Sequence, residues 1–252
     1  MKRYVIIFWI LFSGILSFSQ KTETGINFTD ENGLKQGAWE EKEGFIVFKG
    51  FYKDDTKNGL WREYQASELL HDIQWYSNGK KDGLHVVIDK RGYLKKEEYY
   101  KNNLLHGISR EYTYGANLTS YTVYKNGLID GVNRVYYSHR PGVLLEESLY
   151  AEGKKNGVSK WFDENGNLIA EYNYVNGNFE GLQKSFYENG AVQTEEYYEK
   201  NITVGEYKEY HNNGEIKLLG EYKKGEKTGK WIEYDENGEK IKTEKYKNGV
   251  LK

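Results

Sequence analysis

The sequence of 252 residues contains no cysteine, one proline and one methionine, and its long aliphatic side chains are sparse. The absence of cysteine excludes disulfide bridges, thiolate nucleophiles and thiolate metal sites. The scarcity of Leu, Ile and Val argues against a thick hydrophobic core of the usual kind. The chain has instead 28 Gly and 24 Tyr, and aromatic residues make up 16% of it. Evenly spaced rings in this number argue against a disordered chain.

Residues 1–19 differ from everything after them. Lys2 and Arg3 precede an apolar run from Tyr4 to Leu16, and Ser17-Phe18-Ser19 offers small residues at the two positions that a signal peptidase recognises. This pattern predicts a secretory signal peptide that is cut after Ser19, and therefore export to the periplasm or beyond the cell. The alternative is an N-terminal membrane anchor, but the run is shorter than the ~20 residues that span hydrocarbon. Membrane attachment is thus expected only through an uncleaved signal segment.

The charge balance limits the kinds of partner. The full chain has 36 Lys and Arg against 38 Asp and Glu. Cleavage would remove Lys2 and Arg3 and leave 34 against 38, a net charge of −4. Nucleic acids and anionic lipids attract basic surfaces, so neither is expected as the main partner.

The chain repeats itself with a period of 24 residues from residue 37 to its end. Each unit opens on a glycine, and the step is 24 residues except for one of 26 and a first one of 22. A tyrosine stands near the end of every unit, and a second ring usually stands five residues after the glycine. The repeat glycines are Gly37, Gly59, Gly83, Gly107, Gly131, Gly157, Gly181, Gly205 and Gly229. The phased tyrosines are Tyr52, Tyr76, Tyr100, Tyr124, Tyr150, Tyr174, Tyr198, Tyr222 and Tyr246.

Asn-Gly pairs divide each unit into two strand-like segments. Two such segments around Asn-Gly predict a β-hairpin with a type I′ turn, as at Asn165-Gly166 and Asn237-Gly238. A second recurring motif, "NGxxxG", joins one hairpin to the next. Asn103 or Asn201 stands where its first glycine is missing. Asn is the non-Gly residue that best tolerates a left-handed backbone. Positive φ is therefore predicted at the connector glycines Gly79, Gly127, Gly177 and Gly225. The two extra residues of the fifth unit lie around "SHRPG", which predicts an exposed hairpin tip.

The pattern "G-x-W-x-x-Y-x-x-N-G" followed by "Y-x-N-G-x-x-x-G", as in 229–249 and 59–83, resembles the MORN repeat variant of bacterial proteins. The resemblance covers residues 37–252 and implies an all-β fold, an elongated single-layer twisted antiparallel sheet of about nine tandem hairpins. The chain then divides into a signal peptide at 1–19, an N-terminal lead-in at 20–36 and the repeat domain at 37–252. Ile88 and Lys42 depart from the pattern at the second ring position, and only Trp39, Trp61 and Trp231 fill the Trp position.

A single-layer sheet needs no thick interior, which accounts for the composition. Each ring is expected to lie over the glycine and strand of the next hairpin, with its hydroxyl in water. Stacking between neighbours supplies the stability that a lone hairpin lacks. The Lys-rich last segment, "EKIKTEKYK", is expected to discourage pairing with another chain.

The search for chemistry finds no catalytic, cofactor-binding or metal-binding constellation. Nucleophile elbows, zinc motifs and phosphate-binding loops are missing. The five histidines stand at different phases of the repeat, which favours scattered surface positions. The "DENG" segments at Asp30, Asp163 and Asp235 lack the further ligands of a calcium loop and are interpreted as turns.

The predicted function is therefore an exported, non-enzymatic scaffold that binds a protein or a glycan along one face of the sheet. The phased rings are interpreted as structural. The aromatic residues outside the phase are better candidates for contact with a partner, above all Trp75, Tyr93, Tyr114, Trp161 and Phe179, and with them Phe45, Phe48, Phe51 and Tyr121. The resemblance implies an alternative, because many MORN-variant proteins are similar to YwqK-like antitoxins. The predicted export favours an immunity protein against a toxin outside the cytoplasm over a cytoplasmic antitoxin.

Overall fold

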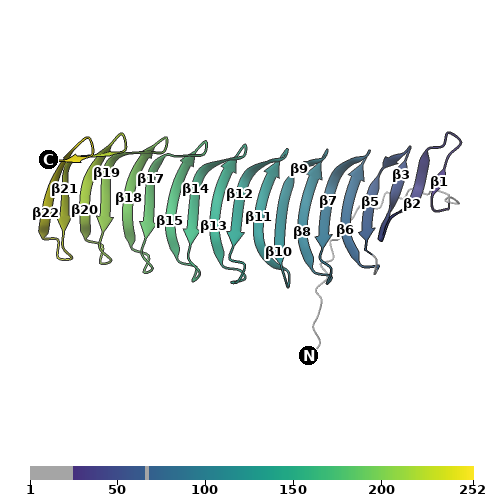
Figure 1. The fold of residues 1–252 in the computed structure, drawn as a ribbon, viewed down its shortest axis with the longest axis horizontal. Helices are drawn as coiled ribbons and strands as arrows, with labels where there is room; N and C mark the ends of the chain where they lie inside the picture. Colours follow the sequence, from purple (N-terminus) through teal and green to yellow (C-terminus); the bar gives the residue numbers. More distant parts are fainter. Residues whose placement is uncertain (1–24, 66–67) are drawn as a thin grey trace, which may run out of the picture.

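The chain forms one open antiparallel sheet, seen here in a computed structural model that describes residues 25–65 and 68–252. The described residues form 23 strands and no helix. The strands follow one another in chain order as an elongated row of hairpins (Figure 1). The predicted fold class is confirmed. The predicted signal peptide lies outside the described residues, and none of those residues forms a helix that could cross a membrane.

The strands are short and closely spaced along the chain. Their bounds are β1 Phe28–Thr29, β2 Lys35–Glu43, β3 Ile46–Lys53, β4 Thr56–Lys57, β5 Gly59–Tyr64, β6 Leu70–Ser77, β7 Lys80–Ile88, β8 Leu94–Lys101, β9 Leu104–Leu105, β10 Gly107–Thr113, β11 Asn117–Lys125, β12 Leu128–Tyr136, β13 Leu144–Ala151, β14 Lys154–Phe162, β15 Leu168–Val175, β16 Asn178–Phe179, β17 Gly181–Phe186, β18 Val192–Glu199, β19 Ile202–Tyr210, β20 Ile216–Lys223, β21 Glu226–Tyr234, β22 Lys240–Lys247 and β23 Val250–Leu251.

The repeat glycine and the phased tyrosine of each unit face each other across one hairpin. Gly59 pairs with Tyr76, Gly157 with Tyr174, and the same register holds in all nine units. The period seen in the sequence therefore reflects the strand register, in which each repeat glycine pairs with the phased tyrosine of its own unit. The glycine opposite each tyrosine belongs to the same hairpin, which corrects the expectation that the ring lies over the glycine of the next one.

The connectors between hairpins are two-residue turns with a left-handed backbone at both positions. Asn176 and Gly177 have φ values of 50° and 85°. The predicted positive φ at Gly79, Gly127, Gly177 and Gly225 is confirmed, as it is for their stand-ins Asn103 and Asn201. Positive φ at both central residues is the type I′ geometry, whose twist matches that of the flanking strands.

The hairpin tips have a different geometry from the one predicted. In the tip at 163–166 only Gly166 has a positive φ, of 87°. The amide of Gly166 donates to the carbonyl of Asp163 at 3.0 Å, and the Asp163 carboxylate accepts from the amides of Asn165 and Asn167. This is a type I turn followed by a left-handed glycine, so the prediction of type I′ turns at the tips was wrong. The Asp30–Gly33 turn, although it precedes Gly37, has the tip geometry as well.

The repeat glycines are required by a bulge. Gln74 pairs with His85 and Tyr76 with Lys81, so Trp75 alone opposes the three residues around Gly83. Gly83 has a φ of 122°, and all nine repeat glycines have positive φ. A Cβ added at Gly83 would lie 3.0 Å from the Cβ of Trp75. At Gly83, Gly107, Gly131 and Gly157 the side chain over the glycine is thus the one that precedes the phased tyrosine of the preceding unit, on the other face of the sheet.

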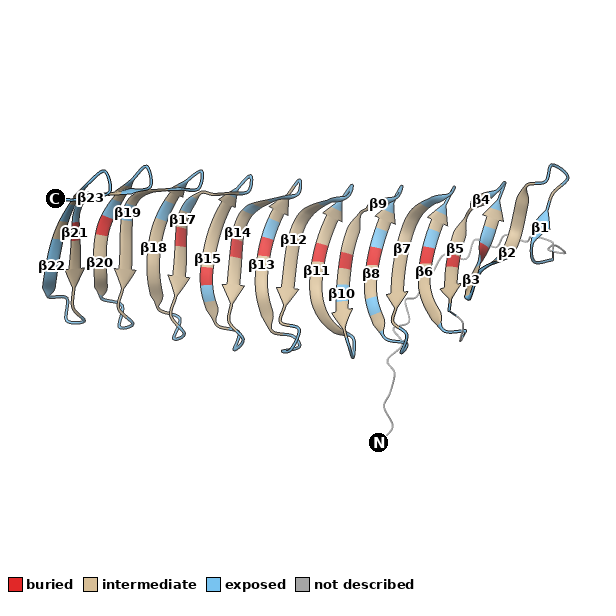
Figure 2. Cartoon of the chain, viewed as in Figure 1, coloured by how far each residue is buried: buried red, intermediate tan, exposed pale blue. Residues whose placement is uncertain are grey.

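Burial is concentrated in a line across the middle of the sheet. Figure 2 shows the buried residues as bands near mid-strand that follow one another from hairpin to hairpin. The sheet also begins before the expected repeat boundary, because β1 in the lead-in pairs with β2. The two inserted residues of the fifth unit lie in the exposed turn at 138–142, as predicted.

Candidate binding surfaces

One face of the sheet carries the nine phased tyrosines and is called here the tyrosine face. Its central row holds the residue two positions before each phased tyrosine and the residue two positions after each repeat glycine. Across the strands this row reads Trp39, Gly50, Trp61, Gln74, His85, Glu98, Ser109, Thr122, Asn133, Ser148, Ser159, Tyr172, Gln183, Glu196, Tyr207, Gly220, Trp231 and Glu244. Trp61 and Trp231 are buried, and so are the polar side chains of Gln74, Glu98, Ser148 and Ser159.

Two tryptophans fill this face near its ends. Trp61 lies over Gly50 and Trp231 over Gly220, so closely that a Cβ added to either glycine would lie 2.2–2.3 Å from a ring atom. The phased tyrosines Tyr52 and Tyr222 meet these indoles edge to face with centroids 5.1 Å apart. Such ring pairs join neighbouring hairpins, as the structural interpretation of the phased tyrosines requires.

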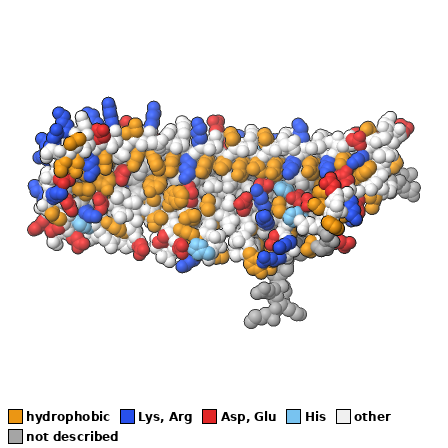
Figure 3. All heavy atoms as spheres, viewed as in Figure 1, with side chains coloured by type: hydrophobic (Ala, Val, Ile, Leu, Met, Phe, Trp, Pro, Cys, Tyr) orange, Lys and Arg blue, Asp and Glu red, His pale blue; other side chains and the backbone are white. Residues whose placement is uncertain are grey.

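Lysines lie over these rings at a fixed position, two residues before the repeat glycine. The ammonium of Lys57 lies 4.0 Å from the Trp61 ring centroid, and that of Lys227 lies 4.1 Å from Trp231. Lys35, Lys81 and Lys155 make similar contacts in their own units. Figure 3 shows the outcome, a band of hydrophobic side chains along the molecule with basic groups set into it. The rings of the tyrosine face therefore make cation–π contacts with lysines of the chain itself.

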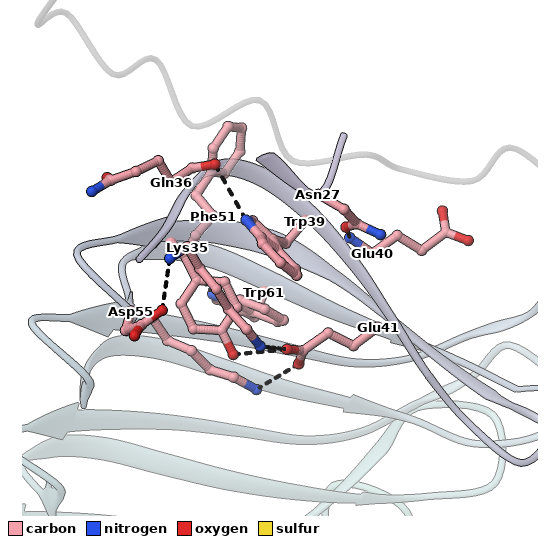
Figure 4. Close-up of polar contacts among 11 residues, drawn as sticks. Asn27, Lys35, Gln36, Trp39, Glu40, Glu41, Phe51, Asp55 and Trp61 are labelled. Atoms are coloured by element: carbon pink, nitrogen blue, oxygen red, sulfur yellow. Dashed lines mark hydrogen bonds and ion pairs between the residues drawn. The ribbon is translucent and has the colours of Figure 1, made fainter. Parts of the chain in front are cut away.

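The first unit adds a carboxylate to this arrangement (Figure 4). Glu41 accepts hydrogen bonds from Lys35 Nζ at 2.7 Å and from the Tyr52 hydroxyl at 2.9 Å. Burial alone would raise the pKa of Glu41, but these donors and the charges of Lys35 and Lys57 outweigh it and lower the pKa. The group is an internal ion pair that closes the N-terminal end of the face.

His85 lies inside the central row, between two carboxylates. Its Nε2 is 2.7 Å from Asp72 Oδ2 and its Nδ1 is 3.0 Å from Glu98 Oε2, with 12% of the side chain exposed. Burial lowers the pKa of His85, but the hydrogen bond and charge of Asp72 and the hydrogen bond of Glu98 outweigh it and raise the pKa. The same site raises the pKa of the Tyr100 hydroxyl to about 12, through burial and the charge of Glu98. His85 is thus not one of a set of scattered surface histidines, and that expectation was wrong for it.

The other histidines serve separate local contacts. His211 Nε2 lies 2.9 Å from the carbonyl of Tyr234 in the next unit, and His139 lies 3.2 Å from Glu164 at the tips. The described residues hold no cluster of three His, Asp or Glu side chains with metal-binding geometry. The Asp163 and Asp235 carboxylates accept amide hydrogen bonds within their own turns.

The opposite face carries an apolar stripe, called here the outer stripe. It consists of the residue before each phased tyrosine and its cross-strand partner after the repeat glycine. Phe51, Trp75, Tyr99, Leu149 and Tyr197 in this stripe are between 39% and 52% exposed. The cross-strand pairs are Ala38–Phe51, Leu60–Trp75, Leu84–Tyr99, Ile108–Val123, Val132–Leu149, Val158–Asn173 and Leu182–Tyr197. In the last two units Glu206–Glu221 and Lys230–Lys245 take their place.

Several charges beside the outer stripe are paired with each other. Arg134 lies 2.6 Å from Glu147, Lys184 lies 2.9 Å from Glu195, and Arg110 lies 3.4 Å from Glu97. The second ring of each unit lies on this side too, where the hydroxyls of Tyr112 and Tyr210 donate to Glu97 and Glu195. The stripe is therefore an apolar strip with a polar border, part of which is paired within the chain.

The five contact candidates from the sequence separate into three places. Trp75 belongs to the outer stripe. Tyr93 and Tyr114 meet at the tips of neighbouring hairpins, with ring centroids 4.9 Å apart. Trp161 and Phe179 lie on the tyrosine face, where Phe179 contacts Tyr172, Tyr174 and Tyr198. The sequence interpretation missed the stripe as a whole, although its members share one signal, their place directly before a phased tyrosine.

Comparison with known families agrees with the repeat seen in the structure. A family model described as MORN repeat variant matches residues 155–176, 179–200, 203–224 and 227–248. Each match begins two residues before a repeat glycine, and successive matches are 24 residues apart. No curated protein matches the chain.

Proposed function

Because the chain is a repeat protein whose residues 155–248 are four tandem MORN repeat variants, we propose that it is a non-enzymatic scaffold that binds a partner protein along the outer stripe. MORN repeats generally serve as repeat scaffolds that often bind partners, and they are not known as an enzyme family. The observation that carries the proposal is the exposure of large apolar side chains at the same position in five of the first seven units, namely Phe51, Trp75, Tyr99, Leu149 and Tyr197.

The chemistry of the stripe favours a protein over a glycan. Exposed apolar patches of this extent mark interaction surfaces in soluble proteins. Glycan sites combine aromatic platforms with unpaired polar groups, whereas several of the charges beside this stripe are paired within the chain. An apolar strip with a polar border has the anatomy of a protein–protein interface. An immunity protein would use the same surface, with a toxin as its partner.

Export is part of the proposal and rests on residues 1–19. The basic start at Lys2 and Arg3, followed by the apolar run, supports cleavage after Ser19. Sequencing the N-terminus of the protein from its native host should find Gln20, within a few residues. An intact Met1 in a soluble cytoplasmic fraction would refute export without touching the proposal on the outer stripe.

The variant Trp75→Ser/Tyr99→Ser tests the surface by removing two neighbouring exposed side chains. The tagged wild-type chain should migrate with its partner as a larger species on size exclusion, and the double variant should lose most of that species. The matched control Tyr93→Ser/Tyr114→Ser removes two exposed rings at the hairpin tips and should keep it. Loss of the larger species in the control variant alone would indicate that the interface lies at the hairpin tips. A complex that resists protease but is released by soluble sugars would point to a glycan.

A further inference from the structure

Three glutamates occupy the same place in different units, two residues before a phased tyrosine. Glu98, Glu196 and Glu244 each accept a hydrogen bond from that tyrosine's hydroxyl, at 3.1, 3.0 and 2.9 Å. All three lie in the central row of the tyrosine face. They form a set of equivalent carboxylates whose surroundings can be compared within one chain.

Two of these carboxylates have a lysine that the third lacks. Lys96 lies 2.7 Å from Glu98, and Lys242 lies 2.6 Å from Glu244, in both cases from two residues earlier on the strand. The equivalent residue beside Glu196 is Thr194, whose hydroxyl is bonded to Ser185 at 2.6 Å. Within the part of the chain that the structure describes, Glu196 has no ion pair.

Lysine also reaches this face from the position two residues before the repeat glycine, but this unit has no lysine there. Two residues before Gly181 stands Phe179, where Lys57, Lys155 and Lys227 stand in their units. In the following unit the position holds Thr203, paired across the strands with Tyr198. Lys184 also lines this region, but its ammonium lies beside the outer stripe, 2.9 Å from Glu195. Neither inward-facing position supplies a positive charge to Glu196.

A hollow opens beside Glu196. In the central row Gln183 stands where Trp61 and Trp231 fill the face in their units, and the space left has a volume of about 240 Å³. Rings of Tyr172, Phe179 and Tyr198 line it, with Phe179 5.5 Å from Tyr172 and 5.4 Å from Tyr198 between centroids. A cavity of roughly 150 Å³ already holds a benzene molecule, so this one has room for a side chain.

The polar lining of the hollow leaves one anionic acceptor for an incoming cation. The Gln183 amide is used by the backbone, since Nε2 donates to the carbonyl of Asn173 and Oε1 accepts from its amide. Glu196 retains accepting capacity beyond its one bond from Tyr198, because an ionised carboxylate has about four lone-pair sites. Three rings and an unpaired carboxylate together form the usual surroundings of an ammonium group.

We propose that this hollow binds the side chain of a lysine from a partner protein, with its ammonium on Glu196 and its methylene chain against the rings of Phe179, Tyr172 and Tyr198. The occupant is taken to be lysine because the chain itself places lysine at the equivalent sites, over the rings and on the glutamates. The site lies on the tyrosine face, opposite the outer stripe, and does not depend on binding there.

Amide NMR of the full chain during titration with Nα-acetyl-lysine methylamide tests the proposal. The probe should cause saturable shifts at Phe179, Glu196 and Tyr198 at millimolar concentration. The same probe acetylated on its side-chain nitrogen lacks the charge and should bind at least about tenfold more weakly. Equal shifts with both probes would overturn the proposal, because the ammonium would then not be recognised.

Two variants and one control complete the experiment. Thr194→Lys supplies the internal lysine of the third and ninth units, so it should remain folded and bind the probe at least about tenfold more weakly. Glu196→Gln should weaken binding similarly. Glu221→Gln makes the same charge change on the opposite face and should bind as the wild type does. Wild-type affinity in both Thr194→Lys and Glu196→Gln would refute the assignment, even if one of the two folded poorly.

Discussion

Glycines serve two physical purposes in this chain, and substitutions can tell them apart. The connector and repeat glycines have a left-handed backbone that side chains rarely adopt. Gly50 and Gly220 have an ordinary backbone and instead leave room for an indole. A side chain introduced in the first group would be strained by the positive φ. A side chain introduced in the second group would collide with an indole ring.

Substitutions of the connector Gly177 test whether glycine is needed for the left-handed backbone. A Cβ there would meet Lys154 at an ordinary 3.8 Å, so any cost comes from its φ of 85°. Gly177→Val should lower the free energy of unfolding by about 1–3 kcal/mol. Gly177→Asn should be nearly neutral, since Asn201 has a φ of 66° at the equivalent place. Thermal melts decide, and equal losses for the two variants would refute the turn assignment.

Gly220 tests the second purpose. Gly220→Ala would place a methyl group 2.3 Å from the Trp231 ring, so the indole must shift. Overpacking of this kind should cost about 1–3 kcal/mol and change the tryptophan fluorescence. Gly25→Ala is the control, because a Cβ there meets nothing within 4 Å. A Gly220→Ala protein as stable as the control would show that Trp231 does not lie against the sheet.

His85 should make stability depend on pH. Its pKa is raised in the folded chain, so its contribution is complete below the ordinary value of 6.5 and is lost as pH rises through the folded value. Urea unfolding above pH 6.5 should therefore show a decline that is absent from His85→Gln. Exposed His139 provides the matched control, His139→Gln, which should keep the decline. An identical pH profile for His85→Gln and the wild type would contradict the carboxylate–histidine contact.

At the scale of the hairpin, the period was predictable from the sequence because it is the register. Gly157 and Tyr174 stand opposite each other in the sheet, so their fixed spacing states the pairing directly. The turn types were not predictable from Asn-Gly alone, because that pair occurs in both turns. What separates them is the loop length and the preceding Asp163, whose carboxylate holds the longer tip.

The contact surfaces were predicted only in part, for a reason of the same kind. Searching for rings outside the phase selected Trp75 but placed it with Trp161 and Phe179, which lie on the other face. Strand alternation was the better guide, because the residue before each phased tyrosine must face away from it. The contact of Asp72 with His85 had no signal in the sequence, since it depends on how neighbouring hairpins meet.

One whole unit should be removable without unfolding the rest. Deletion of residues 157–180 takes out 24 residues and joins Asn156 to Gly181 in register. Each hairpin contacts its neighbours, so the shortened sheet should melt cooperatively with its β-sheet spectrum retained. Two strands fewer at about 4.8 Å each should shorten the particle by roughly 10 Å in solution scattering. A deletion that is one residue longer, 157–181, is the control and should aggregate or unfold, since a one-residue slip reverses the faces. Equal behaviour of the two deletions would contradict the repeat register.

At the scale of the molecule, the last long strand of the sheet is charged. The long strand β22 near the C-terminal edge is largely exposed and carries Lys240, Lys242, Lys245 and Lys247. This agrees with the expected protection against pairing with another chain. The last strand is the short β23, which pairs with Tyr246 and Lys247 and was not anticipated. The apolar stripe also stops before this end, which leaves the first seven units as the proposed contact strip.

Site-specific photocrosslinking in the native host tests the central claim, partner binding along the outer stripe, most directly. A photoreactive phenylalanine analogue would replace Phe51, Tyr99 or Tyr197 on the stripe, and Tyr76 or Tyr124 on the tyrosine face. If a partner binds along the outer stripe, at least two stripe positions should give one protein adduct of the same mass, and the tyrosine face should give none of that mass. Adducts from the tyrosine face alone, or none from any stripe position, would contradict it.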